Sequence, residues 1–391
     1  MQIESLRIKN YRLFRDASFD DLEKLAIVVG ANGTGKSTLF DVFAFLQEAL
    51  NRNVAEAISK RGGLRELVSR GCAGPIEFTI KFRETAGCQT IYQLAISDEH
   101  GQAAIVRERV YLCSRANEKT WHLLDFAMGK GTAITNEQEF SESHSVEETM
   151  QFALKDLSAL AIKGLGQFMG FRIVSELRSL IENWHVSDIR IDDFGPSHEA
   201  SHAEHLSVRG DNLAQVARHL YEHHPDLFNE VLTRMRERIP GVNRVEPRTT
   251  EDGRLVLRFQ DGSFKDPFSS RYVSDGTLKL FAYLVLLYDP APHPMLAVEE
   301  PENQLYPELL YELLEEFRDY ARRGGQVFVS THSPDFLNGA KLDEIYWLVK
   351  ENGFTTVRRA SDSELLRNLI QEGDIPGTLW KQGLFEGAGL R

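Results

Sequence analysis

The sequence predicts an α/β fold, in which a mixed sheet is combined with an antiparallel β layer and an inserted helical lobe. Three observations indicate this class. A short apolar run precedes a glycine-rich turn and a helical pattern, three alternating segments follow, and a helical period then extends from about residue 143 to 239. Strand signals return afterwards, so we expect one discontinuous core at residues 1–140 and 241–391 and the helical lobe at residues 141–240.

The individual elements follow from their periodicity. Strands are expected at residues 3–8, 25–29, 76–82, 91–96 and 105–112, and the last three alternate as in a half-solvated layer. Helices of the lobe are expected at residues 146–164, 171–184, 212–223 and 226–239. Strands return at residues 255–260, 294–298 and 326–330. No segment of the lobe supplies the heptads of a coiled coil.

Composition limits the classes of function. A net charge of −13 argues against a broadly basic nucleic-acid surface, so any DNA contact would be a local patch. Cys72, Cys88 and Cys113 form no Cys-x-x-Cys pair, which fits a reducing cytoplasm. The first residues lack the apolar core of a signal peptide, and the longest apolar run, residues 280–288, is about half the length that crosses a bilayer. We therefore expect a cytoplasmic protein that does not span a membrane.

Residues 30–38 (GANGTGKST) have the spacing of a loop that binds a nucleoside triphosphate, with an apolar strand before it and a helical pattern after it. Glycines let the backbone N–H groups approach phosphate oxygens, and the helix directs its N-terminus at the same anion. Lys36 would reach the β- and γ-phosphates, and Ser37 would offer its hydroxyl to Mg²⁺. The predicted nucleotide-binding residues here are Gly30, Asn32, Gly33, Thr34, Gly35, Lys36, Ser37 and Thr38.

Two further strands are expected to end in polar groups. Residues 295–298 are apolar and lead into Glu299-Glu300-Pro301-Glu302. Glu299 is placed to hold Mg²⁺ and Glu300 to orient or deprotonate an attacking water. The strand at residues 326–330 delivers His332, which could sense a γ-phosphate. An acidic loop and a backbone-bonded loop histidine are the structural alternatives.

A fourth motif, Tyr272-Val-Ser-Asp-Gly-Thr-Leu-Lys279, precedes an apolar helix. Ser274 or Asp275 would cap that helix, whose N–H groups form a second anion site. Taken alone, the motif is equally typical of an ordinary helix cap.

In this order, the motifs resemble the ABC-type ATPase heads of the structural-maintenance-of-chromosomes (SMC) and RecF group. The resemblance is closer still to the stand-alone bacterial AAA/ABC-type ATPases and to the ATPase half of OLD-family nucleases, which share the EEPE and THSP motifs. It covers residues 3–50 and 272–338. It implies a P-loop NTPase fold of ABC/SMC-head type, ATP and Mg²⁺ as ligands, and Lys36, Glu300 and His332 as catalytic residues.

In that family, the signature of one protomer closes on the nucleotide that another protomer holds. The resemblance therefore implies that Ser274 and Gly276 complete the site in trans and that ATP joins a homodimer. Arg12 matches a basic position near the nucleotide, although a solvated turn arginine is equally compatible. The sequence departs from the family at VSDGT, where transporters have LSGGQ, and at Glu299, where aspartate is more usual.

The resemblance also suggests a role. We expect an ATPase that regulates a separate effector, a nuclease or a toxin, in a bacterial anti-phage or toxin-like system, because the segment after His332 is too short for a TOPRIM nuclease domain. The alternative is a RecF-like DNA-binding ATPase in repair or recombination. A transporter subunit that drives a membrane partner is a third possibility, disfavoured by the atypical signature.

Two clusters bear on these alternatives. Lys60, Arg61, Arg65 and Arg70 follow the phosphate-loop helix, and they either contact DNA or form a solvated basic loop. His198, His202 and His205, followed by His223 and His224, either bind a metal or belong to an exposed polar linker.

Overall fold

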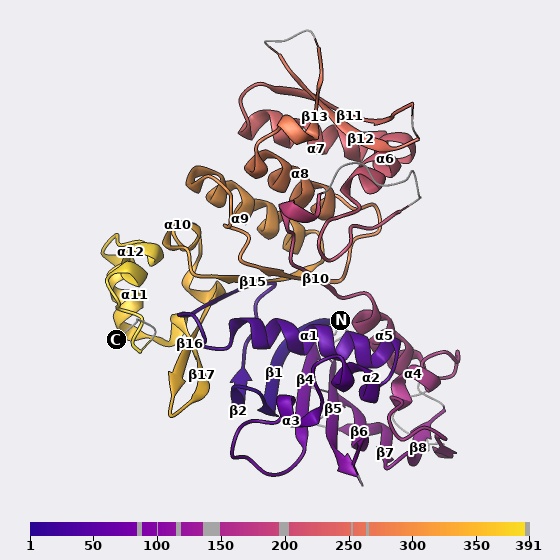
Figure 1. The fold of residues 1–391 in the computed structure, drawn as a ribbon. Helices are drawn as coiled ribbons and strands as arrows, with labels where there is room; N and C mark the ends of the chain where they lie inside the picture. The colour runs from indigo at the N-terminus through magenta and orange to yellow at the C-terminus, as the bar shows by residue number, and fades with distance from the viewer. Residues whose placement is uncertain are drawn as a thin grey trace. The chain divides into compact units, whose positions relative to one another are not determined.

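The computed structural model describes the chain apart from residues 84–87, 100, 115–118, 136–148, 195–202, 252, 263–265 and 388–391. The chain divides into two compact units (Figure 1). The first contains Met1–Trp184, Asp343–Leu366 and Phe385–Arg391, and the second contains His185–Leu342 and Arg367–Leu384. The expected division into a core and a lobe at residues 141–240 stays a prediction.

An antiparallel sheet dominates the first unit. Its described strands follow the order β2-β1-β4-β5-β6-β7-β8-β9. They are β1 (Gln2–Tyr11), β2 (Phe14–Phe19), β4 (Ile76–Arg83), β5 (Cys88–Glu99), β6 (Gln102–Ser114), β7 (Thr120–Ala127), β8 (Lys130–Ile134) and β9 (Thr149–Ala153). Along β4, buried residues alternate with more exposed ones, so one face of the sheet joins the core. The predicted antiparallel layer is confirmed.

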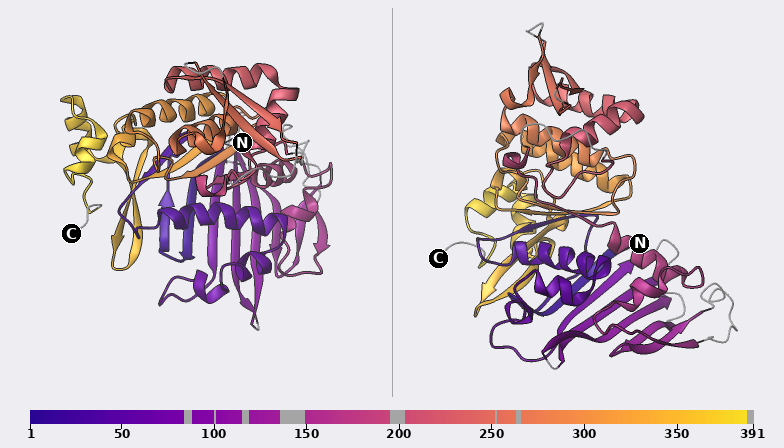
Figure 2. Two further views of the ribbon diagram at one scale, coloured as in Figure 1. Left: turned by 45° about the horizontal axis from the view of Figure 1, so that its top comes forward. Right: turned by 45° about the vertical axis from the view of Figure 1, so that its right-hand side comes forward.

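Helix α1 (Lys36–Asn51) lies across this sheet (Figure 2). Its Phe45 ring packs against Tyr11 of β1 and Phe78 of β4, with both centroid distances 5.8 Å. The other helices of this unit are α2 (Val54–Ser59), α3 (Leu64–Leu67), α4 (Ala161–Leu165) and α5 (Arg172–Glu182). Strand β3 (Leu25–Val29) is fully buried and pairs in parallel with β16 (Ile345–Glu351), which pairs with β17 (Phe354–Arg359). Burial on both faces explains the continuous apolar run in β3.

The second unit contains parallel strands and a buried helix. Strand β14 (Met295–Glu299) lies between β10 (His185–Ser187) and β15 (Gln326–Thr331), and both pairings are parallel. Helix α8 (Asp275–Leu287) is buried from Thr277 onward, as expected for a helix that is apolar on every side. The remaining elements are α6 (Leu213–His223), α7 (Pro225–Arg238), β11 (Val242–Thr249), β12 (Leu255–Asp261), β13 (Phe268–Ser269), α9 (Pro307–Arg322), α10 (Pro334–Leu337) and α12 (Pro376–Lys381), and α11 (Glu364–Gln371) begins in the first unit and ends in the second.

One predicted element is wrong. In place of a helix over residues 146–164, the described part contains β9 and the short helix α4. Strand β9 pairs antiparallel with β8. The apolar residues here have a helical spacing, but pairing with a neighbouring strand determines the local conformation. Among the described helices, none has both the length and the apolar character that a membrane crossing requires.

Candidate nucleotide-binding site

The glycine-rich loop lies in the first unit, between the end of β3 and the start of α1. Two of its glycines have no room for a side chain. A Cβ at Gly30 would lie 2.4 Å from the Thr34 Oγ1 atom, and one at Gly35 would lie 2.7 Å from the Thr355 Oγ1 atom. Gly35 also has φ 109, a left-handed conformation that favours glycine. The loop is thus held tightly enough to present backbone N–H groups to an anion.

The Lys36 side chain is buried at this loop. Its Nζ donates to the carbonyl oxygen of Gly30 at 2.7 Å and to that of Ala31 at 3.3 Å. The carbonyl of Ala31 also accepts from the Thr34 hydroxyl at 2.8 Å, and Thr355 of β17 donates to the carbonyl of Thr34 at 2.6 Å. These bonds hold the ammonium group at the loop.

The first turn of α1 begins without a side-chain cap. Gly35 is the N-cap and has no side chain that could accept from the first N–H groups of the helix, which are the groups that bind anions at helix N-termini. Ser37 is exposed, whereas Thr38 is buried, and Asn32 and Gly33 are exposed on the loop. The open hydroxyl of Ser37 has the oxygen chemistry that Mg²⁺ prefers.

The acid motif lies in the second unit, at the end of β14. Glu299 is the last residue of the strand and is paired in register with Ser330 of β15. Glu300 follows with φ 42, and its backbone N–H donates to the carbonyl of Ser330 at 2.9 Å. A left-handed conformation is costly for a residue other than glycine, and such strain is concentrated at functional sites.

The structure brings together the side chains of Glu300, His332 and Glu302. The Nδ1 atom of His332 is 3.4 Å from an Oε1 atom of each glutamate. Glu302 Oε1 also accepts from the Thr331 hydroxyl at 2.7 Å and from the backbone N–H of His332 at 3.0 Å. The side chain of Glu302 is 7% exposed and that of His332 is 50% exposed. Glu302 therefore fixes the histidine, which faces solvent beside Glu300.

Lys279 is a second residue that sequence reasoning missed. It belongs to α8, is buried, and donates from Nζ to the carbonyl of Asn303 at 2.8 Å. Burial lowers the pKa of Lys279 to about 8, although the charges of Glu302, Asp188 and Glu300 act in the opposite direction. A lysine within an otherwise apolar helix was the available signal, because a buried ammonium group needs acids or carbonyls nearby.

The signature serine begins α8. Ser274 is the N-cap, and its Oγ accepts from the Thr277 N–H at 3.3 Å. Ser274 and Asp275 are exposed. A Cβ at Gly276 would lie 2.9 Å from the carbonyl oxygen of Gln304, so glycine allows the turn after the acid motif to approach the helix closely.

Two family models match overlapping parts of the chain. The model described as "AAA ATPase domain" matches residues 1–187, and the one described as "AAA domain, putative AbiEii toxin, Type IV TA system" matches residues 171–338. Two solved SMC heads share the fold. One, bound to the C-winged helix domain of ScpA, is 15% identical with a TM-score of 0.52 and covers 92% of this chain and 97% of its own. The other is an SMC head with an extended coiled coil, bound to the C-terminal domain of ScpA and derived from Pyrococcus furiosus. It is 14% identical with a TM-score of 0.51 and covers 95% of this chain and 99% of its own. No curated protein matches the sequence.

The chain thus matches ATPase-domain models over residues 1–338 and has the fold of SMC heads. The residues of this ATPase fit a nucleotide. The glycines that a Cβ would obstruct, the buried Lys36 ammonium and the open Ser37 hydroxyl are the donors and ligands that a triphosphate with Mg²⁺ requires. The predicted P-loop fold is confirmed, and the roles of the individual site residues stay predictions.

Three of the basic residues predicted to be functional, Arg12, Lys60 and Arg61, pair with acids of α1. Arg12 NH1 lies 3.1 Å from Asp41, and Arg61 Nε is 2.7 Å from the same carboxylate. Arg61 also pairs with Glu48 at 2.8 Å and is 10% exposed, and Lys60 pairs with Glu48 as well. Arg61 is thus part of the internal structure. Arg65 and Arg70 are exposed, and Arg70 pairs with Glu66 at 2.8 Å.

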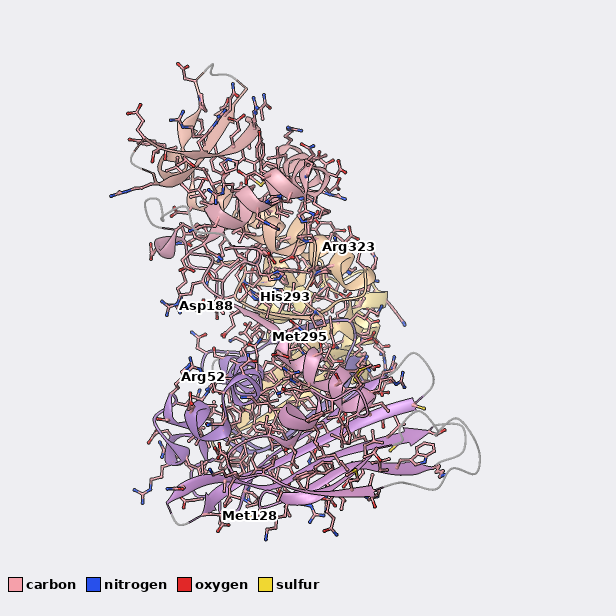
Figure 3. The ribbon with its side chains drawn as sticks, turned by 90° about the vertical axis from the view of Figure 1, so that its right-hand side faces the viewer. Arg52, Met128, Asp188, His293, Met295 and Arg323 are labelled. Carbon is pink, nitrogen blue, oxygen red and sulfur yellow. The ribbon has the colours of Figure 1, made fainter. Side chains whose placement is uncertain are left out.

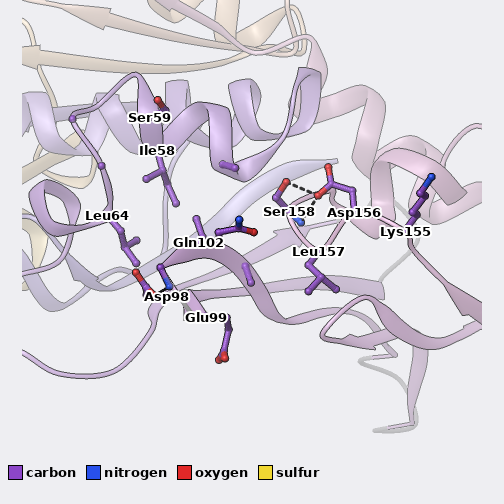
Figure 4. A pocket seen from close by; sticks show the side chains of 16 residues that line it. Ile58, Ser59, Leu64, Asp98, Glu99, Gln102, Lys155, Asp156, Leu157 and Ser158 are labelled. Atoms are coloured by element: carbon purple, nitrogen blue, oxygen red, sulfur yellow. Dashed lines mark hydrogen bonds between the residues drawn. The ribbon is translucent and has the colours of Figure 1, made fainter.

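The predicted histidine cluster is only partly described. His198 and His202 lie outside the described residues. A separate cavity of about 870 Å³ opens in the first unit, lined by segments that include Ile58, Gln102 and Leu157 (Figure 4). At the edge of this cavity, the Asp156 carboxylate accepts a hydrogen bond from the Ser158 hydroxyl at 2.7 Å. The residues lining this cavity include none of the predicted site residues.

Proposed function

We propose that this ATPase binds ATP through its phosphate loop and hydrolyses it with the catalytic groups of its acid motif. Lys36 and the backbone N–H groups of the loop bind the phosphates. Ser37 and Glu299 hold Mg²⁺, which supplies charge neutralisation of the phosphate oxygens when it is bound. The observation that carries the proposal is the contact of His332 with both Glu300 and Glu302 at the end of β14.

Glu300 orients the attacking water and accepts its proton. Its carboxylate is half-buried, and Asn303 Nδ2 donates to Glu300 Oε2 at 3.2 Å, so the side chain has a defined position. His332 lies against Glu300 and remains half exposed, so it can donate a hydrogen bond to a γ-phosphate oxygen. Glu302 acts as a positioning residue for His332 through the bonds described above.

We further propose that ATP joins two protomers. Ser274 and Asp275 are exposed at the start of a 13-residue helix, where the helix N-terminus can meet the phosphates held by a second protomer. The closed dimer would bind the γ-phosphate that hydrolysis removes, so turnover would return the dimer to monomers. Asp275 places a negative charge near this contact and would weaken closure.

The output is proposed to be control of a separate effector, a nuclease or a toxin, in a bacterial defence system. The description of the second family model supports a toxin-like setting. The solved SMC heads are bound to domains of ScpA, which supports the idea that this fold presents surfaces to a partner protein. The effector would respond to the monomer or the dimer, and thereby to the nucleotide state.

The test is the variant Glu300→Gln, which keeps the shape of the side chain and removes its basicity. We expect ATP turnover to fall by about 10²–10⁴-fold with ATP affinity unchanged, because proton transfer is lost and phosphate binding is kept. Steady-state hydrolysis and equilibrium nucleotide binding provide the two measurements, and exposed Glu66→Gln is the control. Normal turnover in Glu300→Gln would place the base elsewhere and remove the observation on which the proposal rests.

A second candidate is a RecF-like DNA-binding ATPase. The exposed Arg65 and Arg70 favour it, because both are available to phosphates. Arg61, in contrast, already neutralises Asp41 and Glu48.

A further inference from the structure

Three side chains that are far apart in the sequence meet in the second unit. His205 precedes α6, and Asp289 follows α8. His293 lies two residues before β14 begins at Met295 (Figure 3). Each offers one ligand atom, and these atoms lie within 4.8 Å of one another. We propose that His205, Asp289 and His293 bind a Zn²⁺ ion.

The donor set suits this metal. Imidazole nitrogens and a carboxylate oxygen are common zinc ligands, at about 2.0–2.2 Å from the ion. The His205 Nδ1 atom is already 2.7 Å from Asp289 Oδ2, and the His205 and His293 ring centroids are 5.4 Å apart. Closing the group around an ion requires movements of about 1 Å. The side chain of His205 is 45% exposed, so it has room for this adjustment and leaves a path for the metal.

Burial of the carboxylate supports a cation here. The side chain of Asp289 is 2% exposed, and its Oδ1 accepts from the Ala291 N–H at 2.8 Å. A buried carboxylate is costly unless it is paired or bound to a metal. The ring of His185 stacks on His293 with centroids 4.7 Å apart, and its Nε2 has no hydrogen-bond partner among the described residues. Zinc ligands commonly have such packed surroundings, which fix their rings.

The position of these three ligands in the chain indicates what the ion would do. It would hold residues 289–294, the connection between α8 and β14, against the loop that precedes α6. Glu299, the proposed Mg²⁺ ligand, ends β14 about 13 Å from Met295 at 3.3 Å per residue, and His293 lies before Met295, so the zinc would be separate from Mg²⁺. We therefore assign it a stabilising role in the link between the signature helix and the acid strand.

The experiment uses the full chain after treatment with a chelator. Zn²⁺ alone is titrated in competition with a metal indicator, and Co²⁺ is the spectroscopic probe because its visible bands report coordination number. We expect one Zn²⁺ per chain, bands of a low-coordinate Co²⁺ site, and at least about tenfold weaker binding in His205→Ala and in His293→Ala. The exposed His122→Ala variant is the matched control and should bind as the unchanged protein does.

Further variants separate the alternatives. Asp289→Asn keeps an acceptor for Ala291, and its thermal unfolding temperature should no longer rise with Zn²⁺. If His205→Ala and His293→Ala retain full affinity while His198→Ala with His202→Ala loses it, the metal binds elsewhere and the proposal is wrong. The absence of a stoichiometric Zn²⁺ in the unchanged chain would leave only a His205–Asp289 ion pair and would also overturn it. Because His205 is exposed, its variant stays informative if Asp289→Asn fails to fold.

Discussion

At the scale of single residues, Lys36 combines a buried side chain with a charged group that has backbone carbonyl oxygens as partners. Its Nζ donates to the carbonyls of Gly30 and Ala31, which hold the ammonium group at the phosphate loop. A charge-assisted hydrogen bond contributes on the order of 1.5–3 kcal/mol. The lysine is therefore the residue whose loss should most directly affect nucleotide binding.

We expect Lys36→Ala to weaken ATP binding by at least about a hundredfold, which corresponds to roughly 2.7 kcal/mol. Isothermal titration with ATP and Mg²⁺ measures this change. Lys81→Ala, on the exposed side of β4, is the control for removal of a positive charge. Unchanged ATP affinity in Lys36→Ala would refute the assignment of the phosphate loop.

Residues of the phosphate loop were predictable because their roles depend on a short contiguous segment. Gly30 and Gly35 are needed for close backbone approaches, and the spacing of the motif already expresses that need. Glu302 and Lys279 were not predictable in the same way. Their significance depends on contacts with residues from other strands and turns, and no local pattern reports which acid of Glu299-Glu300-Pro301-Glu302 turns toward His332.

At the scale of elements, α8 connects the signature with the core of the second unit. The helix is buried from Thr277 onward, whereas Ser274 and Asp275 at its start are exposed. A bulky charged group at the N-terminus would therefore disturb a partner surface and leave the helix packing intact. Ser274 is the position for this test.

We expect Ser274→Arg to bind ATP with unchanged affinity as a monomer and to fail to dimerise. Light scattering with ATP should show the monomer mass for Ser274→Arg with Glu300→Gln and twice that mass for Glu300→Gln alone. Thr233→Arg, on the exposed side of α7, is the control for adding a guanidinium group. A dimer that persists in Ser274→Arg would exclude the signature from the interface.

Glu108 of β6 accepts from two N–H groups of α4, and its titration predicts that stability depends on pH. Burial raises the pKa of Glu108 to about 7, although the N–H groups of Ala161 and Ile162 and the Tyr92 hydroxyl favour its charged form. The folded state therefore holds this proton more tightly than the unfolded state. The associated stability is present below about pH 4.5 and is lost as the pH rises to about 7.

We expect Glu108→Gln to remove this dependence. The free energy of unfolding of the unchanged protein relative to the variant should fall by on the order of 3 kcal/mol between pH 5 and pH 8, as measured by urea unfolding. The amide will not satisfy both N–H donors, so the variant also carries a cost that does not vary with pH. If the free energies of unfolding of the two proteins changed equally with pH, this result would contradict the raised pKa of Glu108.

Elements with a strong period were predictable. Strand β3 and helices α5, α6 and α7 match the expected ranges to within a few residues, since each buries one continuous face or run. Short strands such as β10 were missed. Its three residues owe their conformation to pairing with β14, a contact with a distant segment.

At the scale of the whole molecule, the net charge of −13 opposes DNA binding, so a DNA contact would require a local basic patch. Charge reversal at Arg61 would be uninformative, because it would place a glutamate against Asp41 and Glu48. Arg65 and Arg70 allow a cleaner test, since both are exposed.

We expect Arg65→Glu with Arg70→Glu to leave ATP turnover unchanged, with or without duplex DNA. Hydrolysis assays and a DNA-binding titration at two salt concentrations measure this outcome, and Lys81→Glu is the control. A DNA affinity that falls in the double variant, with a smaller salt dependence, would favour the RecF-like alternative.

The hydroxyl of Thr355 supports a loop that lies 321 residues earlier in the chain, at the carbonyl of Thr34. During synthesis, the glycine-rich segment leaves the ribosome long before β16 and β17 exist to brace it. A nascent chain should therefore acquire tight nucleotide affinity late, once the hairpin containing Thr355 has emerged. Productive folding of the loop is in this way delayed until the segment 321 residues further along the chain has been made.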